Sequence, residues 1–146
     1  MNKQELLNII KAKINDKIQS FENLIAETRA SNNDTKSSMG DKYETGREML
    51  QQEINNLQRQ LNEALNQQSI IQKISAEASG KVQTGALVKT DKGLFYVAVS
   101  VGEIILENQK IMTVSAESPL IKAMSGKKAG ETFSVNAVSQ TIWSIE

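Results

Sequence analysis

The chain has 146 residues, and its 17 basic and 17 acidic side chains give a formal charge of zero. This balance predicts neither a nucleic-acid binder nor a protein that binds membrane surfaces. Cysteine and histidine are both absent, which excludes disulfides, thiolate nucleophiles, Cys/His zinc sites and an imidazole base. Any chemistry must therefore come from carboxylates, hydroxyls, lysines or a partner.

The first residues, MNKQELLNIIKAKINDK, mix charged and apolar side chains too closely for a signal peptide. No apolar run in the sequence approaches the roughly 20 residues that a membrane span requires. We therefore expect a soluble, cytoplasmic protein with no membrane partner.

Residues 1–80 show the spacing of two long helices. In the first, Leu7, Ile14, Phe21 and Thr28 recur every seven residues, Ile10 and Leu24 occupy a second position that Lys17 interrupts, and Ile18 and Ile25 widen the stripe. In the second, Leu50, Ile54, Leu57, Leu61, Ala64, Gln68 and Ile71 are alternately four and three apart. The segment between them is rich in Asn, Ser and Gly, which is typical of a loop. The pattern predicts an antiparallel coiled-coil hairpin with its tip at about residues 31–44. A monomer is expected, and the pattern leaves association of the coiled coil between chains open.

Residues 81–146 change to a period of two. Short runs rich in Val, Ile, Thr and aromatic residues predict strands, namely GALVKT, LFYVAV, KIMTVS, ETFSVNAV and QTIWSIE, with a hairpin turn at TDKG. SPLIKAMSG predicts one short helix that Ser118 caps, that Pro119 begins and that Gly126 ends. The whole chain is therefore expected to be α+β, with a small antiparallel sheet domain and one short helix after the hairpin.

Two carboxylates, Asp41 and Glu44, stand three residues apart where the second helix would begin. One interpretation is a capping box, in which Asp41 accepts from a backbone N–H and Glu44 reaches back to the cap. The other is a shared cation, because residues three apart on a helix can direct two carboxylates to one Mg²⁺. Two monodentate acids hold Mg²⁺ weakly, so this second interpretation requires a partner that supplies further ligands.

Several stretches resemble the Gre family of bacterial transcript-cleavage factors. GDKYE contains the Gly-Asp-x-x-Glu of that family's arm tip, as Gly40, Asp41 and Glu44. SPLIKAMSGKKAGE is similar to a segment of its C-terminal domain, matched at Ser118, Pro119, Ala123, Gly126, Lys127, Gly130 and Glu131. VSVGE, residues 99–103, resembles a Val-Gly-acid turn that precedes this segment in the family.

The resemblance implies a coiled-coil arm followed by a C-terminal domain of FKBP-like fold. It implies that the arm enters the secondary channel of RNA polymerase, where Asp41 and Glu44 help to hold a Mg²⁺ ion and nascent RNA is cleaved. The protein would then be an accessory factor and not an enzyme. Partner contacts are expected from Gly40, Lys42, Tyr43 and Arg47 at the tip, and from Ser118, Pro119 and Lys127 in the second domain.

Some features leave alternatives open. Gly46 and Arg47 follow the second acid, where Gly46 would loosen the helix start and Arg47 could pair with Glu44. Lysines and arginines along the arm form either a basic stripe facing RNA or a solvated face. An FKBP-like fold is compatible with prolyl isomerase activity, which needs a deep aromatic pocket. Core packing is instead expected for the aromatic residues, namely Phe95, Tyr96, Phe133 and, with partial exposure, Trp143.

Two rival functions follow. One is a regulator that occupies the polymerase channel without stimulating cleavage. The other, from a different class, is a coiled-coil interaction or chaperone module. The polar stretch between Arg29 and Ser38 argues against the second, because client-binding surfaces usually carry apolar patches.

Overall fold

The computed structural model describes the backbone of residues 1–36 and 44–146, and the side chains of residues 1–31 and 46–146. The chain divides into two compact units. One, the hairpin unit, is Lys13–Gln68; the other, the sheet unit, joins Met1–Ala12 to Ser69–Glu146. The domain boundary expected near residue 80 stays a prediction.

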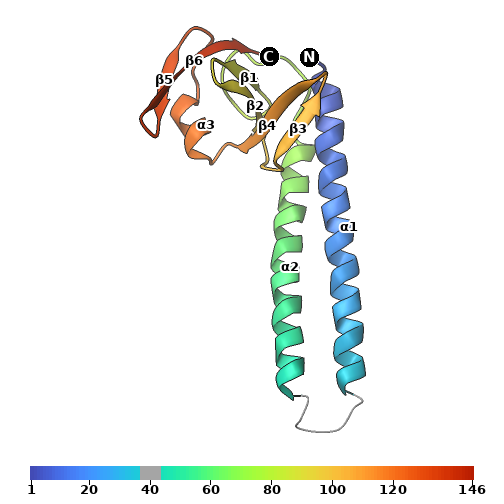
Figure 1. Ribbon diagram of the computed structural model, residues 1–146. Coiled ribbons are helices and arrows are strands. Elements are labelled where there is room, and N and C mark those ends of the chain that lie inside the picture. Colours follow the sequence, from blue (N-terminus) through green and yellow to red (C-terminus); the bar gives the residue numbers. More distant parts are fainter. Residues whose placement is uncertain (37–43) are drawn as a thin grey trace. The chain divides into compact units, whose positions relative to one another are not determined.

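Two helices side by side form the hairpin unit (Figure 1): α1 spans Lys3–Lys36 and α2 spans Glu44–Gln72. Side-chain bonds fix their antiparallel register, because Gln68 Nε2 donates to Asn15 Oδ1 over 2.8 Å and Lys17 Nζ donates to Gln67 Oε1 over 3.4 Å. The antiparallel hairpin predicted from the sequence is confirmed.

The apolar seam of this unit departs from the predicted one on α1. Ile14, Ile18 and Ile25 are buried, whereas Leu24, predicted for the seam, is 42% exposed. Lys17 occupies the place where a seven-residue repeat needs an apolar side chain, so the stripe moves by one residue to Ile18 and Ile25. On α2 the predicted seam is confirmed, since Ile54, Leu61 and Ala64 are buried.

Six strands form one sheet in the order β3-β4-β2-β1-β6-β5. Their bounds are β1 Leu87–Thr90, β2 Gly93–Ala98, β3 Glu103–Leu106, β4 Gln109–Ser115, β5 Thr132–Val135 and β6 Val138–Ile145. The TDKG turn joins β1 to β2 as predicted, with Thr90 opposite Gly93. The α+β class is confirmed, but the sheet is mixed and not antiparallel throughout, because β2 and β4 pair in parallel. β3 was not predicted from the sequence. It pairs with β4 at the edge of the sheet and connects β2 to β4, so that these two strands can run in parallel.

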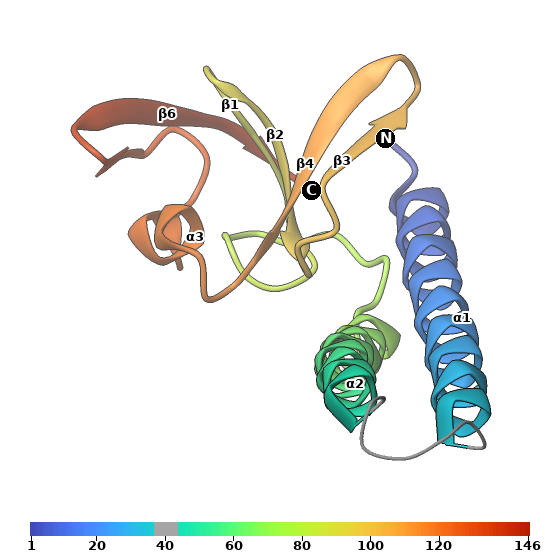
Figure 2. The ribbon, with the colours of Figure 1, turned by 60° about the horizontal axis from the view of Figure 1, so that its bottom comes forward.

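One short helix, α3 (Pro119–Met124), packs on one face of the sheet (Figure 2). Its buried Ile121 and Met124 join a core cluster with Val88, Val97 and Ile142 from three adjacent strands. Because side chains alternate along a strand, Leu87 and Tyr96 point to the other face, and both are buried. Both faces of the sheet therefore contribute buried side chains to the core.

The start of α1 belongs to the sheet unit. Leu6, Leu7 and Ile10 are each at most 1% exposed, and α2 adds the fully buried Ile71. Lys3 is also buried, and its Nζ donates to the main-chain oxygens of Glu77 and Glu146 over 2.6 and 3.0 Å. These bonds attach the first turn of α1 to the segment after α2 and to the end of β6.

Two tight turns that the sequence pattern concealed have left-handed backbone at both central residues, Glu107–Asn108 and Asn136–Ala137. The second divides the predicted strand ETFSVNAV into β5 and β6. Such turns suit twisted hairpins and usually contain Asn or Gly. Here the alternation of apolar residues continued through the turn and predicted one strand.

Replacing Ala137 by Gly will stabilise the protein. Ala137 has a φ of 64°, and a left-handed conformation costs a residue with a Cβ about 1–2 kcal/mol. Glycine avoids this cost but loses more backbone entropy on folding, so we expect a net gain of about 0.5–1 kcal/mol. Urea unfolding measures it, and Ala129→Gly, at an exposed loop position without positive φ, is the control that should not stabilise. A gain no larger than the control's would contradict the turn assignment.

Among the helices in the described part of the chain, none is long and apolar enough to cross a membrane.

Candidate functional site

The predicted tip lies mostly outside the described residues. Gly40, Asp41, Lys42 and Tyr43 fall there entirely. Glu44 is the first residue of α2, but its side chain also lies outside the described part. The structure therefore places the motif between the end of α1 and the start of α2, and the roles of its side chains stay predictions.

The first described side chains of α2 border this segment. Gly46 is exposed, and a Cβ added to it would meet no atom within 4 Å. Packing does not require glycine at this position. Arg47 is half-buried and Glu48 is exposed. Arg47 lies three residues before Leu50, in line with the α2 seam, so its side chain lies against the hairpin more than that of Glu48 does.

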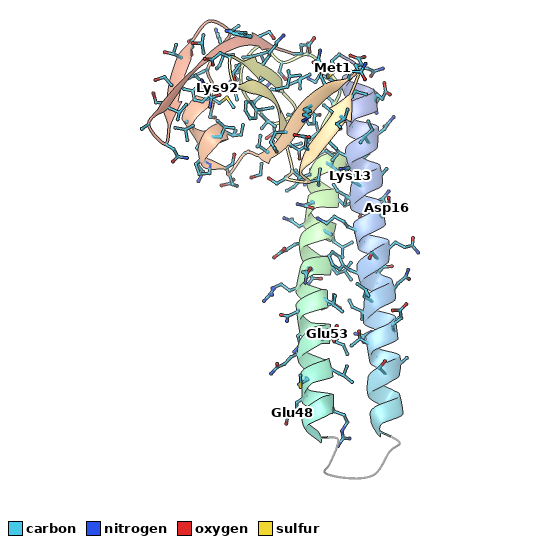
Figure 3. The ribbon with its side chains drawn as sticks, viewed as in Figure 1. Met1, Lys13, Asp16, Glu48, Glu53 and Lys92 are labelled. Atoms are coloured by element: carbon cyan, nitrogen blue, oxygen red, sulfur yellow. The ribbon has the colours of Figure 1, made fainter. Side chains whose placement is uncertain are left out.

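The exposed surface of the hairpin unit mixes both charges. Lys13 and Asp16 on α1, and Glu48 and Glu53 on α2, are all exposed (Figure 3). Lys17, one of the lysines of the alternative basic stripe, bonds to Gln67 across the hairpin. Acids therefore interrupt the basic residues on both helices, which favours a solvated face over an RNA-binding stripe.

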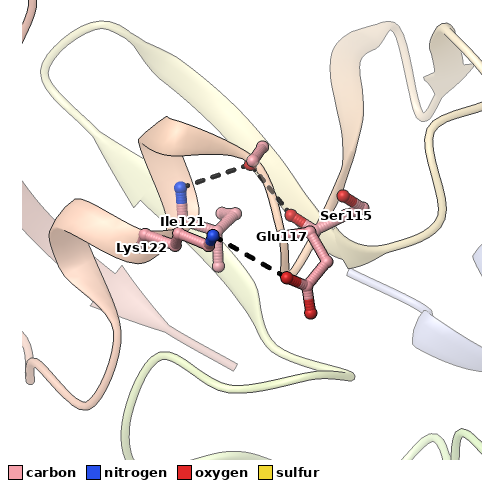
Figure 4. Close-up of polar contacts among 5 residues, drawn as sticks. Ser115, Glu117, Ile121 and Lys122 are labelled. Carbon is pink, nitrogen blue, oxygen red and sulfur yellow. Dashed lines mark hydrogen bonds and ion pairs between the residues drawn. The ribbon is translucent and has the colours of Figure 1, made fainter.

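The Ser-Pro motif of the sheet unit builds the start of α3 (Figure 4). Ser118 Oγ accepts from the Ile121 N–H over 3.3 Å and donates to the Ser115 oxygen over 2.8 Å. Lys122 pairs with Glu117 over 3.8 Å, but both side chains are exposed, so the pair contributes little. The cap and helix predicted from SPLIKAMSG are confirmed, and the hydroxyl of Ser118 is engaged within the protein.

The glycines after α3 also have structural functions. Gly126 ends the helix with a φ of 77°, and its N–H donates to the Val82 oxygen over 2.9 Å. Gly130 has a φ of 91° and donates to the Ile142 oxygen over 2.8 Å. Lys127, which was expected to bind a partner, is half-buried and follows the helix, while Ser118 and the exposed Pro119 stand at its start.

The Val-Gly-acid turn is held by a residue that the sequence did not single out. Thr113 is 2% exposed, and its hydroxyl accepts from the Val101 N–H over 2.9 Å and donates to the Gly102 oxygen over 2.6 Å. Gly102 has a φ of 86°, which explains the glycine. The sequence did not predict this contact, because a single threonine in a strand is not a distinctive pattern.

Comparison with known proteins gave matches to solved structures only. No protein-family model matches the chain, and no curated protein matches it. The chain is similar in structure to GreA factor homolog 1 (Gfh1) of Thermus thermophilus, over 93% of this chain and 94% of that one, with 17% identity and a TM-score of 0.40. A second structure of the transcription factor Gfh1 covers 93% and 92% at 13% identity and a TM-score of 0.39. Gfh1 of Thermus aquaticus covers 92% of both chains, at 15% identity and a TM-score of 0.36.

Gfh1 is named as a homolog of GreA.

Metal ligands and aromatic linings were sought among the described residues, because the sequence raised both. Within that part of the chain, no three acidic side chains are grouped so that they could hold a metal ion. Two hollows of the sheet unit, about 400 and 230 Å³ in volume, have no aromatic side chain in their lining. Tyr96 and Phe133 are instead buried in the core, Phe95 is half-buried, and Trp143 is 58% exposed. The core packing expected from the sequence is thus confirmed for Tyr96 and Phe133, and the partial exposure for Trp143.

Proposed function

We propose that this chain is an accessory factor of RNA polymerase that inserts its hairpin into the secondary channel and stimulates cleavage of backtracked nascent RNA. The observation that carries the proposal is a Gly-Asp-x-x-Glu sequence between two long antiparallel helices. With 34 and 29 residues, α1 and α2 are about 50 and 43 Å long. Helices of this length are suited to carrying a short acidic segment into a deep cleft of a partner.

The chemistry rests on Asp41 and Glu44. Carboxylates are preferred ligands of Mg²⁺, which keeps several waters and binds through one or two acids in shared sites. The ion would polarise the scissile phosphate and lower the pKa of a bound water. Asp41 and Glu44 would hold and orient the ion, while the polymerase supplies the remaining ligands and the RNA. The chain alone is then no enzyme, and it works in the cytoplasm as a monomer.

Docking of the sheet unit has a candidate surface on the sheet face that α3 covers in part, toward the opposite edge from β5. Phe95 is half-buried and lies opposite Met112 across β2 and β4, and Ile105 is the diagonal neighbour of Met112 on β3. Met112 and Ile105 are 41% and 65% exposed. α3 has only six residues and packs mainly on β5, so this strip of the same face stays open. We propose that it contacts the polymerase together with Pro119 and Lys127.

A transcript-cleavage assay tests the proposal. In stalled, backtracked complexes of the cognate polymerase with Mg²⁺, the wild-type protein should shorten the RNA. Asp41→Asn and Glu44→Gln keep the size and hydrogen-bonding capacity of each side chain but remove the charge, so each should slow cleavage by about 100-fold without loss of binding. Glu48→Gln removes an exposed acid one helical turn further along α2 and is the matched control.

Three outcomes are distinguishable. Loss of cleavage only in the Asp41 and Glu44 variants supports the metal-holding role. Equal cleavage by all variants would mean that the two acids act only as a helix cap. Binding of the wild-type protein without cleavage would favour the second candidate, a regulator that occupies the channel. Gly46 and the half-buried Arg47, two and three residues after Glu44, are the features that favour that candidate.

A further inference from the structure

The strand β3 forms one edge of the sheet, and among the described helices and strands only β4 runs alongside it. In an antiparallel pair, every second residue of a strand bonds to the neighbouring strand. The Thr113 N–H donates to the Gly102 oxygen over 3.1 Å, so the even-numbered residues of β3 are the ones that bond to β4. The main-chain N–H and C=O groups of Glu103 and Ile105 therefore point away from the sheet.

The side chain of Ile105 makes this edge apolar. It is 65% exposed, whereas its neighbours Ile104 and Leu106 are buried on the other face. The opposite edge of the sheet, β5, differs, because its outward main-chain groups belong to Thr132 and Ser134, whose exposed side chains end in hydroxyls. Edge strands can accept a further strand, and charges, proline or bulges usually prevent this. At the centre of β3 an exposed isoleucine stands instead.

The outward main-chain groups decide the class of ligand. An N–H and a C=O of one residue are satisfied together by an extended polypeptide, which offers a carbonyl and an amide at the matching spacing. Such a strand would place one of its side chains directly beside Ile105, where an apolar residue packs best. Ile105 lies on the same face as Met112 and Phe95. An added strand would therefore continue the docking strip proposed above.

A second copy of β3 is a poor occupant of this edge. Antiparallel pairing centred on Ile105 would place Glu103 opposite Glu107 of the other copy, and like charges directly opposite each other are destabilising. Pairing centred on Ile104 would place the apolar Ile105 opposite Glu103. A segment of a different polypeptide avoids both conflicts.

We infer that β3 is the place where an extended segment of a partner protein joins the sheet as a further strand, with main-chain bonds to Ile105 and an apolar side chain beside it. The inference rests on the proposed function for the identity of the partner, which we take to be RNA polymerase. It specifies how that partner binds. The main chain of β3 makes the directional bonds, and the exposed side chains of the strip add apolar contact.

Amide hydrogen exchange of the wild-type protein, free and with the core polymerase, tests the inference without any substitution. In the free protein the outward amide of Ile105 should exchange rapidly. In the complex its exchange should slow on the order of 100-fold, because the amide then donates to the added strand. Ser134, whose amide points outward from β5, is the matched reference and should exchange at the same rate in both states. Mass spectrometry with fragmentation to single residues measures both.

Binding by variants gives a second readout. Ile105→Pro removes the outward N–H but no bond to β4, and sheets tolerate proline at such edge positions. It should raise the Kd for the polymerase by about 30-fold. Ile105→Thr keeps the N–H and the branched shape, so it should raise the Kd only about threefold. Ser134→Pro makes the same change on β5 and should leave the Kd unchanged. All three variants should keep the circular dichroism spectrum of the wild-type protein.

Each outcome decides the question. Slowed exchange at Ile105 together with weak binding of Ile105→Pro supports the added strand. Binding without slowed exchange, with equal effects of Ile105→Pro and Ile105→Thr or with none, overturns the inference but leaves the proposed function intact. Absence of any binding removes both. Slow exchange at Ile105 in the free protein, accompanied by dimers in sedimentation analysis, would assign the edge to a second copy and would also overturn the inference.

Discussion

A fragment of residues 81–146 will show no cooperative unfolding transition, although it contains every strand of the sheet. The sheet unit also includes residues 1–12 and 69–80. Leu6, Leu7, Ile10 and Ile71 come from these segments and are fully or almost fully buried. Burying one such side chain contributes about 1.5–3 kcal/mol, so the four contribute about 6–12 kcal/mol. That is on the order of the whole stability of a small domain.

A permuted chain provides the matched control. The Met1 amino group lies 3.6 Å from a side-chain oxygen of Glu146, so a short Gly-Ser linker can join the last residue to the first. A chain that runs from residue 69 to 146 and then, through this linker, from 1 to 12 contains the whole unit. It should unfold cooperatively in urea with an m-value suited to its size. Cooperative unfolding of the 81–146 fragment alone would contradict the described unit.

Raising the pH from 10 to 12 will destabilise the wild-type protein through Tyr96, and Tyr96→Phe will remove this effect. Tyr96 is fully buried, and none of the described residues bonds to its hydroxyl. Burial raises its pKa from 10.0 to about 12. Because the pKa is higher in the folded state, this stabilisation is complete below pH 10 and is lost as the pH rises to 12. The loss is about 1.4 kcal/mol per pH unit, or about 2.7 kcal/mol in all.

The comparison of the two proteins isolates Tyr96. Burial lowers the pKa of Lys3, partly opposed by the charge of Glu146, so Lys3 adds stability as the pH rises toward 10.5. This contribution is the same in both proteins and cancels in the difference. At pH 7, Tyr96→Phe should also be more stable by about 1 kcal/mol, because it removes an unpaired buried hydroxyl. Urea unfolding at pH 7 and from pH 9 to 12 measures both effects, and parallel curves between pH 9 and 12 would contradict the raised pKa of Tyr96.

The regular elements were predictable where one signal dominated. Spacings of three and four along α2 predicted its seam, and Ser118, Pro119 and Gly126 predicted the bounds of α3, because each acts through contacts within a few residues. The shift of the α1 seam to Ile18 and Ile25 was less predictable. Leu24 fits the repeat as well as Ile25 does, and packing against α2 decides between them.

Features that depend on distant contacts escaped prediction. The parallel pairing of β2 with β4 requires that β3 take the edge, and a four-residue strand after a glycine turn gives little signal. The inclusion of residues 1–12 in the sheet unit depends on Lys3 meeting Glu77, 74 residues away. The candidate tip was found because its two acids are close in sequence, whereas the exposure of Trp143 results from a bulge between strands far apart in the chain.

The divided composition of the sheet unit affects how the protein is made. The hairpin unit is continuous in sequence, so it can form while later residues are still being added by the ribosome. Residues 1–12 leave the ribosome before any strand of the sheet, yet their place in the structure is complete only after β6 has been synthesised. Until then Leu6, Leu7 and Ile10 stay without their native contacts and offer an apolar stripe to chaperones. Large N-terminal fusions that hinder this late docking should therefore lower the yield of folded protein. Changes in the C-terminal part of the hairpin unit should lower it less.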